Sequence, residues 1–352
     1  MLYFLSDILR AYFGPFRLLG SYTVLIGIAL LLGFFATMLL LPKFYPLLPK
    51  DRGREFTVNP EAAVGKPTGA GVVFISFFVL ITFFLIIPST FQIVVLLLTL
   101  ASMLTGFLDD RSEKPWGEYF KGVLDLIIAA VASVALYFLY FNKNVQFWFP
   151  FTSGVFTVHP VVFFIVSILL IWFSINTTNC SDGVDGLSGM LVLMALLALG
   201  GIFYFVLGHV TVAEYLLVPN IADGAHWAVI IFSLAGVLLG YIWHNAHPSS
   251  VLMGDAGSRA LGFFISILVL VSKNPFLILM SSSIMLINGG TGLLKVFMLR
   301  FFHIPLFKNI RFPLHDHMRK KNNWSVEQVL IRFLILQFVC TLVLFGIIFK
   351  IR

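Results

Sequence analysis

Carboxylates stand at four places along the ends of long apolar runs: Asp109-Asp110, Asp182 with Asp185, Asp255, and Asp316. Asp182 and Asp185 lie in the stretch SINTTNCSDGVDGLSG, residues 174–189, which contains no Lys or Arg. Neighbouring anions of this kind need a cation, a distant basic side chain or open water. If Gly183 opens a helix, the two carboxylates share its first-turn face. The plain alternative is that Ser181 and Asp182 only cap that helix.

The composition indicates that a lipid bilayer surrounds these residues. The chain of 352 residues is 59% hydrophobic and 11% charged, whereas a soluble domain is about a quarter charged. The net charge of +7 is spread over short loops, so we expect no nucleic-acid partner. Ten apolar runs follow the N-terminal stretch: 21–41, 69–87, 91–108, 122–141, 161–175, 187–207, 227–243, 260–272, 275–299 and 329–349.

These runs predict an all-α integral membrane protein with about ten transmembrane helices, because lipid cannot satisfy open backbone groups. The fifth and eighth runs are short and need their polar flanks to span. We interpret residues 1–352 as a single polytopic domain, with an interfacial helix over 1–17. Residues 141–160, with a Ser153-Gly154 turn, favour a short β-hairpin.

The distribution of Lys and Arg predicts the orientation. Even-numbered connections hold only Lys143 and Lys273, so the basic odd-numbered connections are expected to be cytoplasmic and both termini periplasmic. Arg10, Arg17, Lys350 and Arg352 oppose this assignment but are fewer. The odd connections hold Lys43, Lys50, Arg52, Arg54, Lys66, Arg111, Lys114, Lys121, Arg259, Arg300, Lys308, Arg311, Arg319, Lys320 and Lys321.

All four acidic places fall in odd connections and hence on one membrane face. Together they predict an oxygen-ligand site for Mg²⁺, which uses one or two carboxylates plus substrate phosphates. Basic residues on the same face could hold phosphate: Lys66, Arg111, Lys121 and Arg259. A cation between acids, with bases around it, suits phosphoryl transfer, which depends on positioning and charge neutralisation.

Local patterns leave alternatives at several of these residues. Asp109-Asp110 ends a predicted helix, where anions are disfavoured, so a bound cation or functional role is favoured. Asp255 lies in a glycine-flanked turn that suits either a phosphate or an ordinary N-cap. Asp125 follows Lys121 by four residues, which predicts an ion pair within one helix.

Two further stretches are ambiguous on local grounds. In His315-Asp316-His317 the histidine spacing disfavours zinc, so the histidines are either donors to phosphate or sugar oxygens or solvated loop residues. Residues 288–292, NGGTG, should loosen or break the ninth helix. A break there could open a lateral path for a lipid or serve small-residue packing, and we favour packing.

Five motifs in a fixed order carry a resemblance to a known family. They are DD at 109–110, NxxDGxDGL at 179–187, NAHP at 245–248, MGDxGS at 253–258 and PLHxH at 313–317. With ten spans, this order resembles the polyprenyl-phosphate N-acetylhexosamine-1-phosphate transferases over nearly the whole chain. Residues 66–69 (KPTG) look like a variant of the family's KxxxTPTMGG, and the tail at 323–329 is similar to that of its peptidoglycan-synthesising member.

The resemblance implies a membrane transferase of the bacterial cytoplasmic membrane. It would move phospho-MurNAc-pentapeptide from UDP-MurNAc-pentapeptide to undecaprenyl phosphate, giving lipid I and UMP, with Mg²⁺ as cofactor. A homodimer is a further expectation. Two alternatives stay open: a sister enzyme that takes UDP-GlcNAc or another amino sugar, and, more distantly, a secondary transporter.

The resemblance also implies roles for individual residues. Asp255 would bind Mg²⁺, Asp109 would act on the lipid phosphate as general base or nucleophile, and Asp110 would support the metal–pyrophosphate site. Substrate-binding residues would be Lys66, Thr68, Lys121, Asn179, Asp182, Asp185, Asn245, His315 and His317.

Four positions depart from the family pattern. Asp316 replaces the middle histidine of the PxHHH motif, and Leu252 replaces the aromatic residue that stacks on uracil. Ala63 stands where the family has a lysine, and Lys295 where it has a glutamine. These changes leave the acids intact and affect the expected recognition of the uridine.

Overall fold

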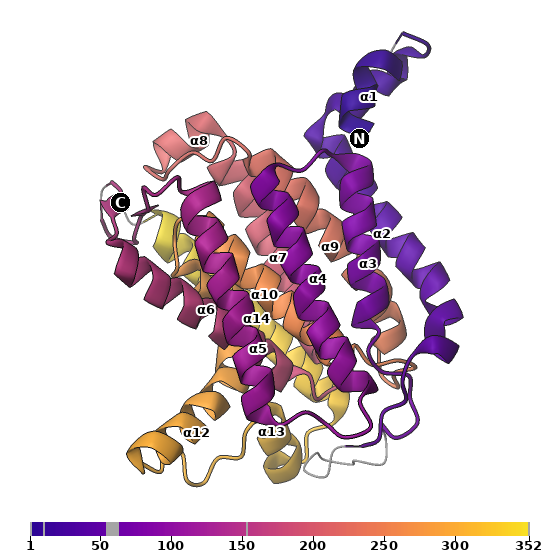
Figure 1. The fold of residues 1–352 in the computed structure, drawn as a ribbon, viewed down its shortest axis with the longest axis vertical. Helices are drawn as coiled ribbons and strands as arrows, with labels where there is room; N and C mark the ends of the chain where they lie inside the picture. Colours follow the sequence, from indigo (N-terminus) through magenta and orange to yellow (C-terminus); the bar gives the residue numbers. More distant parts are fainter. Residues whose placement is uncertain (1, 10, 54–62, 153, 351–352) are drawn as a thin grey trace.

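The computed structural model describes residues 2–9, 11–53, 63–152 and 154–350 (Figure 1). Four residues used in the sequence analysis lie outside this part of the chain: Arg10, Arg54, Ser153 and Arg352. The described helices are α1 (Leu2–Leu9), α2 (Tyr22–Phe44), α3 (Gly71–Leu85), α4 (Thr90–Arg111), α5 (Glu118–Ala135), α6 (Pro160–Ser181), α7 (Leu187–Gly201), α8 (Val210–Tyr215), α9 (Gly224–Asn245), α10 (Gly254–Val271), α11 (Leu277–Met285), α12 (Thr291–Phe302), α13 (Leu314–Asn322) and α14 (Val326–Lys350).

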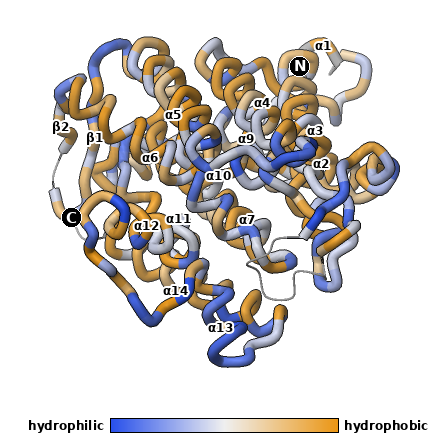
Figure 2. Tube along the Cα trace, turned by 60° about the horizontal axis from the view of Figure 1, so that its bottom comes forward, coloured by the Kyte–Doolittle hydropathy of each residue, from blue (hydrophilic) through white to orange (hydrophobic). Residues whose placement is uncertain are grey.

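The apolar runs fold into the predicted bundle of membrane-spanning helices. Among the described residues, nine helices are long and apolar enough to cross a membrane, and α3 is a shorter apolar helix beside them. The two short runs are completed by polar flanks, as expected: α6 continues to Ser181, and α10 begins at Gly254. Hydrophobic residues cover the helices and hydrophilic residues gather in the connections and in α13 (Figure 2).

Helix α10 is the centre of the bundle. All of its residues are buried, and it packs against α3, α4, α6 and α7. Its close approach to α4 depends on Gly106, because a Cβ there would lie 2.3 Å from the carbonyl oxygen of Asp255. This crossing places the C-terminal end of α4, with its two aspartates, directly beside the N-terminal end of α10.

The ninth span is interrupted, as its glycines predicted. A π-helical segment, Leu286–Gly290, joins α11 to α12, and α12 diverges from the bundle with no buried residue (Figure 1). The interruption packs tightly on α6, because a Cβ on Gly289 would lie 2.5 Å from the carbonyl oxygen of Thr177. The small residues therefore serve helix packing, the reading that the sequence favoured.

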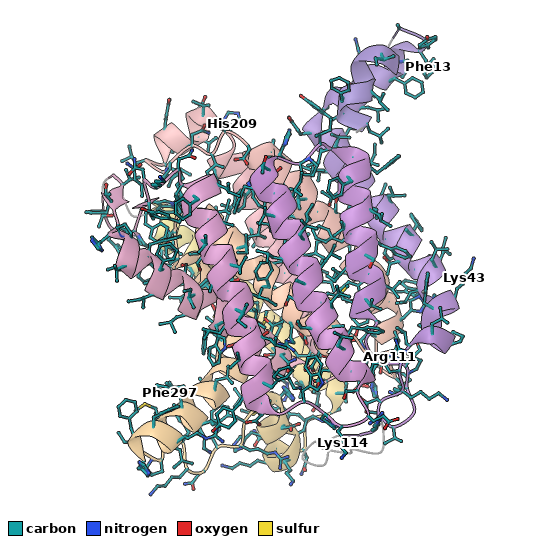
Figure 3. All side chains as sticks on the ribbon, in the orientation of Figure 1. Phe13, Lys43, Arg111, Lys114, His209 and Phe297 are labelled. Atoms are coloured by element: carbon teal, nitrogen blue, oxygen red, sulfur yellow. The ribbon has the colours of Figure 1, made fainter. Side chains whose placement is uncertain are left out.

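The predicted hairpin forms at the end of the bundle opposite the acidic residues. Strands β1 (Gln146–Phe147) and β2 (Phe156–Thr157) pair antiparallel, with Phe147 opposite Phe156. At the other end, near the labelled Arg111 and Lys114, lie the C-terminal end of α4 and the N-terminal end of α5 (Figure 3). Ion pairs and hydrogen bonds join the N-terminal end of α10 to both and to the C-terminal end of α6. The four acidic places of the sequence thus occupy one end of the bundle, as predicted.

Candidate functional site

Two helix-borne carboxylates share one ammonium group at this end. Lys121, in the first turn of α5, places its Nζ 2.5 Å from Asp109 Oδ2 and 3.0 Å from Asp255 Oδ2. Asp109 Oδ1 also accepts a hydrogen bond from the Trp116 backbone N–H at 2.7 Å. Asp109 and Asp255 are 8% and 6% exposed, whereas the Lys121 side chain is 26% exposed. The centre is therefore mostly desolvated, and its positive partner lies closest to solvent.

Asp110 fixes the position of Asp255 through the backbone. Its two carboxylate oxygens each accept one α10 amide N–H, from Asp255 and from Ala256, both at 3.0 Å. This contact caps the α10 N-terminus from another helix. The N-cap alternative for Asp255 is wrong, since Asp255 is the second residue of α10. Gly254 allows the approach, with φ +68° and a Cβ position only 2.3 Å from Asp110 Oδ2.

The predicted Lys121–Asp125 pair within α5 is wrong. Asp125 instead contacts Arg259 of α10, with Arg259 Nη2 at 2.5 Å and Nε at 3.2 Å from Asp125 Oδ1. Lys121 and Asp125 each pair with an oppositely charged residue of α10 instead of with each other. Arg259 is 1% exposed and cannot serve as an open phosphate-binding base, whereas Arg111 is exposed at the end of α4.

Asp182 and Asp185 lie in a turn between α6 and α7, not in the first turn of a helix. Helix α6 extends to Ser181 because its polar side chains bond within the helix, as Ser181 Oγ does to the Thr177 carbonyl oxygen. Asp182 follows as the C-cap residue, and α7 begins only at Leu187. The expectation that Gly183 opens a helix, and the capping alternative at Ser181 and Asp182, are both wrong.

Asp185 is held by the NAHP loop. Its Oδ2 lies 2.8 Å from His247 Nδ1 and accepts the Ser249 N–H at 3.1 Å, and its Oδ1 accepts from Ser249 Oγ at 2.8 Å. Burial raises the pKa of Asp185, but the hydrogen bonds from His247 and Ser249 outweigh burial, so the pKa lies below its ordinary value. Lys66 Nζ donates to Ser249 Oγ at 3.0 Å and joins this network.

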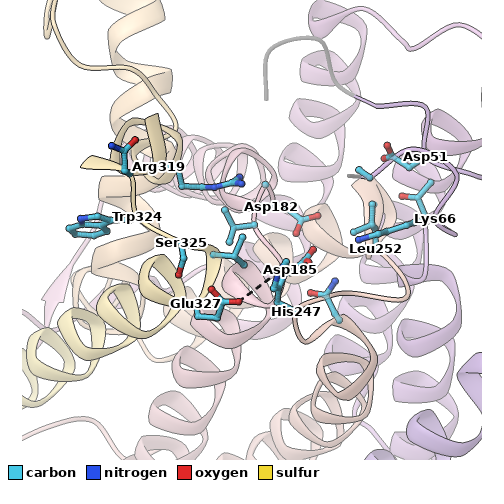
Figure 4. A pocket seen from close by; sticks show the side chains of 18 residues that line it. Asp51, Lys66, Asp182, Asp185, His247, Leu252, Arg319, Trp324, Ser325 and Glu327 are labelled. Carbon is cyan, nitrogen blue, oxygen red and sulfur yellow. Dashed lines mark hydrogen bonds and ion pairs between the residues drawn. The ribbon is translucent and has the colours of Figure 1, made fainter. Parts of the chain in front are cut away.

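A cavity of about 570 Å³ opens beside this network (Figure 4). Its wall contains five of the predicted substrate-binding residues together with Gly254, which adjoins Asp255: Lys66, Thr68, Asp182, Asp185 and Asn245. Ala63 and Leu252, two of the departures from the family pattern, also line it. The volume suits a nucleotide-sized ligand.

Two asparagines connect the elements around the cavity. Asn245 Oδ1 accepts the Gly186 N–H at 2.8 Å, while its Nδ2 donates to the Val251 carbonyl oxygen at 2.8 Å. Asn179 Nδ2 donates to Ser258 Oγ of α10 at 3.3 Å. Asn245 therefore ties together the two loops that line the cavity, and Asn179 ties the end of α6 to α10.

The two histidines of the PLHxH motif lie on different sides of helix α13. His315 is 2% exposed and approaches the Asp182–Asp185 turn, because a Cβ on Gly183 would lie 2.5 Å from His315 Nε2. The backbone N–H and ring Nδ1 of His315 contact Asn288 Oδ1 at 2.9 and 3.1 Å. His317 Nδ1 instead accepts the Arg311 N–H at 3.2 Å, away from the cavity lining.

Asp316, the departure from the family pattern in this motif, is buried beside Arg311, with Arg311 Nε 3.8 Å from Asp316 Oδ2. Burial raises the pKa of Asp316, and the nearby Arg311 only partly offsets it. Lys295, the fourth departure, donates to the carbonyl oxygens of Phe307 and Ile310 at 3.0 and 2.9 Å. It therefore supports the loop after α12 and does not line the cavity.

The sequence reasoning missed several residues in and around the cavity wall. Ser249 connects Lys66 to Asp185, and Asn288 contacts His315 from the interrupted ninth span. Just before α14, Trp324 lines the cavity, and the Arg332 guanidinium stacks 4.3 Å from its ring centroid. Ser249 and Asn288 depend on loop and kink geometry that no local pattern encodes.

The acidic centre has a donor set that fits Mg²⁺. The described residues contain no cluster of three or more His, Cys, Asp or Glu side chains placed to hold a metal ion. Mg²⁺ needs fewer protein ligands when it binds together with substrate phosphates, because one or two carboxylates and water complete its coordination. Asp109 and Asp255 already converge on a single positive group, the ammonium of Lys121. A divalent ion beside the same two oxygens would be bound by hard ligands.

Comparison with known proteins gives consistent matches. The model of glycosyl transferase family 4 matches residues 92–273. A phospho-N-acetylmuramoyl-pentapeptide-transferase of Treponema pallidum is 58% identical over 98% of this chain and 95% of its own length. The protein of the same name from Sulfurimonas denitrificans is 32% identical over 96% of each chain. That from Campylobacter jejuni is 29% identical over 94% of this chain and 95% of its own.

Proposed function

The chain belongs to glycosyl transferase family 4 and to the phospho-N-acetylmuramoyl-pentapeptide transferases, and we propose that it carries out that transfer at the site described above. The donor is UDP-MurNAc-pentapeptide and the acceptor is undecaprenyl phosphate, so the products are UMP and lipid I. The reaction is a step of peptidoglycan synthesis. The observation that carries this assignment is the Asp109–Lys121–Asp255 centre at the edge of a nucleotide-sized cavity.

The cavity is the donor site in this proposal. Lys66, Thr68 and Asn245 line it with hydrogen-bond donors, and Asp182 and Asp185 form its acidic edge. Gly254 lines the cavity and adjoins Asp255, so a diphosphate bound in the cavity would lie beside the proposed Mg²⁺ ligand. His315, behind the Asp182–Asp185 turn, supports the shape of that edge, and His317 stabilises the Arg311 backbone instead of touching the donor.

In this proposal Mg²⁺ would be held at the acidic centre, with Asp255 as its ligand. Four carboxylates and two bases form the connected network Asp109, Asp110, Asp125, Asp255, Lys121 and Arg259. When all are ionised, their formal charge is −2, which one divalent cation balances. When bound, the ion would neutralise the donor diphosphate and polarise it towards attack. Asp110 orients Asp255 through the α10 amides, and Lys121 holds the two carboxylates together.

Asp109 lies where it can act on the acceptor. It ends α4 at the margin of the centre, and the Trp116 N–H and Lys121 Nζ hold its two oxygens in fixed directions. In this position it serves the acceptor phosphate, as general base or as nucleophile. A fixed carboxylate of this kind contributes through orientation, because correct placement removes much of the entropic cost of reaction.

The membrane supplies the acceptor. An apolar hollow of about 320 Å³ on the flank of α6 and α11 is lined by Leu169, Leu170, Phe173, Ile278, Leu279 and Leu286. Such a surface suits a polyprenyl chain. The proposal places the acidic end of the bundle at the cytoplasmic face of the inner membrane, in line with the basic odd connections. The homodimer stays a prediction.

The test is a transfer assay with the full chain in proteoliposomes. UDP-MurNAc-pentapeptide, undecaprenyl phosphate and Mg²⁺ should give UMP and lipid I, and EDTA should stop the release. Matched reactions contain UDP-GlcNAc in place of the donor. No UMP from correctly folded protein would contradict the proposal, and faster turnover of UDP-GlcNAc would assign the chain to the sister activity.

A further inference from the structure

A second charged pair lies directly behind the Lys121–Asp255 contact. On α5, Lys121 and Asp125 are four residues apart; on α10, Asp255 and Arg259 are also four residues apart. The order of charges is opposite on the two helices, so they meet in two successive contacts. Lys121 Nζ lies 3.0 Å from Asp255 Oδ2, and Arg259 Nη2 lies 2.5 Å from Asp125 Oδ1. Residues four apart share one helix face, which aligns both contacts.

Arg259, in the pair with Asp125, also bonds to the backbone of Lys121. Arg259 Nη2 donates to the Lys121 carbonyl oxygen at 3.3 Å, and Nε donates to Asp125 Oδ1 at 3.2 Å. From α6, Asn176 Nδ2 donates to Asp125 Oδ2 at 3.3 Å. Helix α5 packs on α4 and α6 more than on α10. Long side chains, not close backbone packing, therefore fix the register between α5 and α10.

Stability alone does not account for this pair. Arg259 and Asp125 are each 1% exposed, and buried charges carry a desolvation cost that well-packed apolar residues avoid. Arg259 Nη1 is buried without a hydrogen-bond partner among the described residues, a further cost. Ionisable groups within membrane-spanning helices point to a functional role.

We propose that the Asp125–Arg259 pair is a positioning device that holds Lys121 against Asp109 and Asp255. Arg259 and Asp125 are positioning residues, since neither lies in the cavity wall or contacts Asp109. The predicted effect on turnover rests on the proposed function. The predicted position of the Lys121 ammonium does not depend on it. Without the inner pair, the first turn of α5 loses its register and the Lys121 ammonium spends less time between the two carboxylates.

The experiment measures the chemical accessibility of the Lys121 amine in the full chain, purified in detergent with EDTA. The parent and the double variant Asp125→Leu/Arg259→Leu are treated with an acetylating reagent, and the rate at Lys121 is followed by mass spectrometry. The matched control is Ser133→Ala/Ser167→Ala, which removes another buried polar contact (2.9 Å) of α5, farther along the helix. We expect several-fold faster acetylation in the pair variant and an unchanged rate in the control.

Steady-state transfer gives the second readout. The pair variant should lose kcat by about 10-fold with donor KM nearly unchanged, because misplacing a group at the centre slows the reaction more than it weakens binding. A purely structural role would lower the melting temperature and leave both the Lys121 rate and kcat per folded enzyme unchanged, which would overturn the proposal. If the parent releases no UMP, the proposed function fails while the acetylation comparison still decides this inference.

If the double variant does not fold, Arg259→Lys replaces it. A lysine ammonium keeps the charge but cannot reproduce the two-nitrogen contact with Asp125 and the Lys121 carbonyl oxygen. We expect faster acetylation of Lys121 in this variant as well. An unchanged rate in folded Arg259→Lys protein would overturn the proposal.

Discussion

The acidic end of the bundle contains two kinds of carboxylate, and they are held in different ways. Asp109, Asp110 and Asp255 lie near helix ends, and their partners are a lysine of α5, backbone amides of α10 and the Trp116 amide in the connection between α4 and α5. Asp182 and Asp185 lie in a turn, and Asp185 is held by loop side chains from the NAHP segment. Helix packing gives the first group a fixed geometry, which suits charge stabilisation during reaction. Loop support gives the second group a shape that can adapt to a donor.

The largest fall in kcat is expected for a substitution in the helix-borne group, at Asp255. Asp255→Asn should lower kcat by about 1,000-fold or more, because it removes a charge aimed at the reacting diphosphate. Asp223→Asn is the matched control: it is an aspartate at the start of α9 at the opposite end of the bundle and should keep near-parental kcat. Near-normal turnover of Asp255→Asn in the UMP-release assay would remove Asp255 from the metal site.

A smaller effect is expected at Asp110, which acts through Asp255. Asp110→Asn keeps one acceptor oxygen for the α10 amides and should lower kcat by about 10- to 100-fold with little change in donor KM. The change in kcat is measured together with the melting temperature. A large fall in melting temperature with unchanged kcat per folded enzyme would show that Asp110 stabilises the helix junction without positioning Asp255.

Lys66 should affect binding more than chemistry. Lys66→Ala removes a cavity-lining charge and the hydrogen bond to Ser249, so donor KM should rise by about 10-fold while kcat falls less. Lys50→Ala is the control, because Lys50 is exposed in the same connection and does not line the cavity. An unchanged KM in Lys66→Ala would show that Lys66 does not bind the donor.

The smallest effects concern pH and have opposite signs at two aspartates. The pKa of Asp185 is lowered by folding, so its contribution to stability is present above its ordinary pKa and is lost as pH falls through the folded value. The pKa of Asp316 is raised by burial, so the folded state is favoured below its ordinary pKa and loses stability as pH rises towards the folded value.

Melting temperatures of Asp185→Asn and Asp316→Asn measured from about pH 2.5 to pH 7, a range that includes the ordinary pKa of an aspartate, test these signs. Near pH 7, Asp185→Asn should melt lower than the parent and Asp316→Asn higher, each by about 1–3 °C. The Asp316 difference should shrink as pH falls towards the ordinary pKa of aspartate, and the Asp185 difference should shrink only as pH falls below that value. Parallel curves for parent and variant across this range would contradict the assigned directions.

The sequence predicted the helix-borne half of this site better than the loop-borne half. Hydropathy placed the helices, and the odd-numbered connections between them gathered the acids at one end, as the structure confirms. The cytoplasmic side assigned from Lys and Arg stays a prediction. The i,i+4 rule failed at Lys121 and Asp125, because each found a closer partner on α10 than on its own helix. Asp182 and Asp185 were misplaced, because polar side chains prolonged α6 where the pattern favoured a new helix start.

The central claim, that Asp255 and its neighbours at the acidic end hold one divalent ion, is tested most directly by Mn²⁺ binding. The full chain with UMP in detergent is titrated with Mn²⁺, and the bound ion is followed by EPR. We predict tight binding in the parent and in Asp223→Asn, and loss of binding in Asp255→Asn. Equal Mn²⁺ affinity in the parent and Asp255→Asn would contradict the claim.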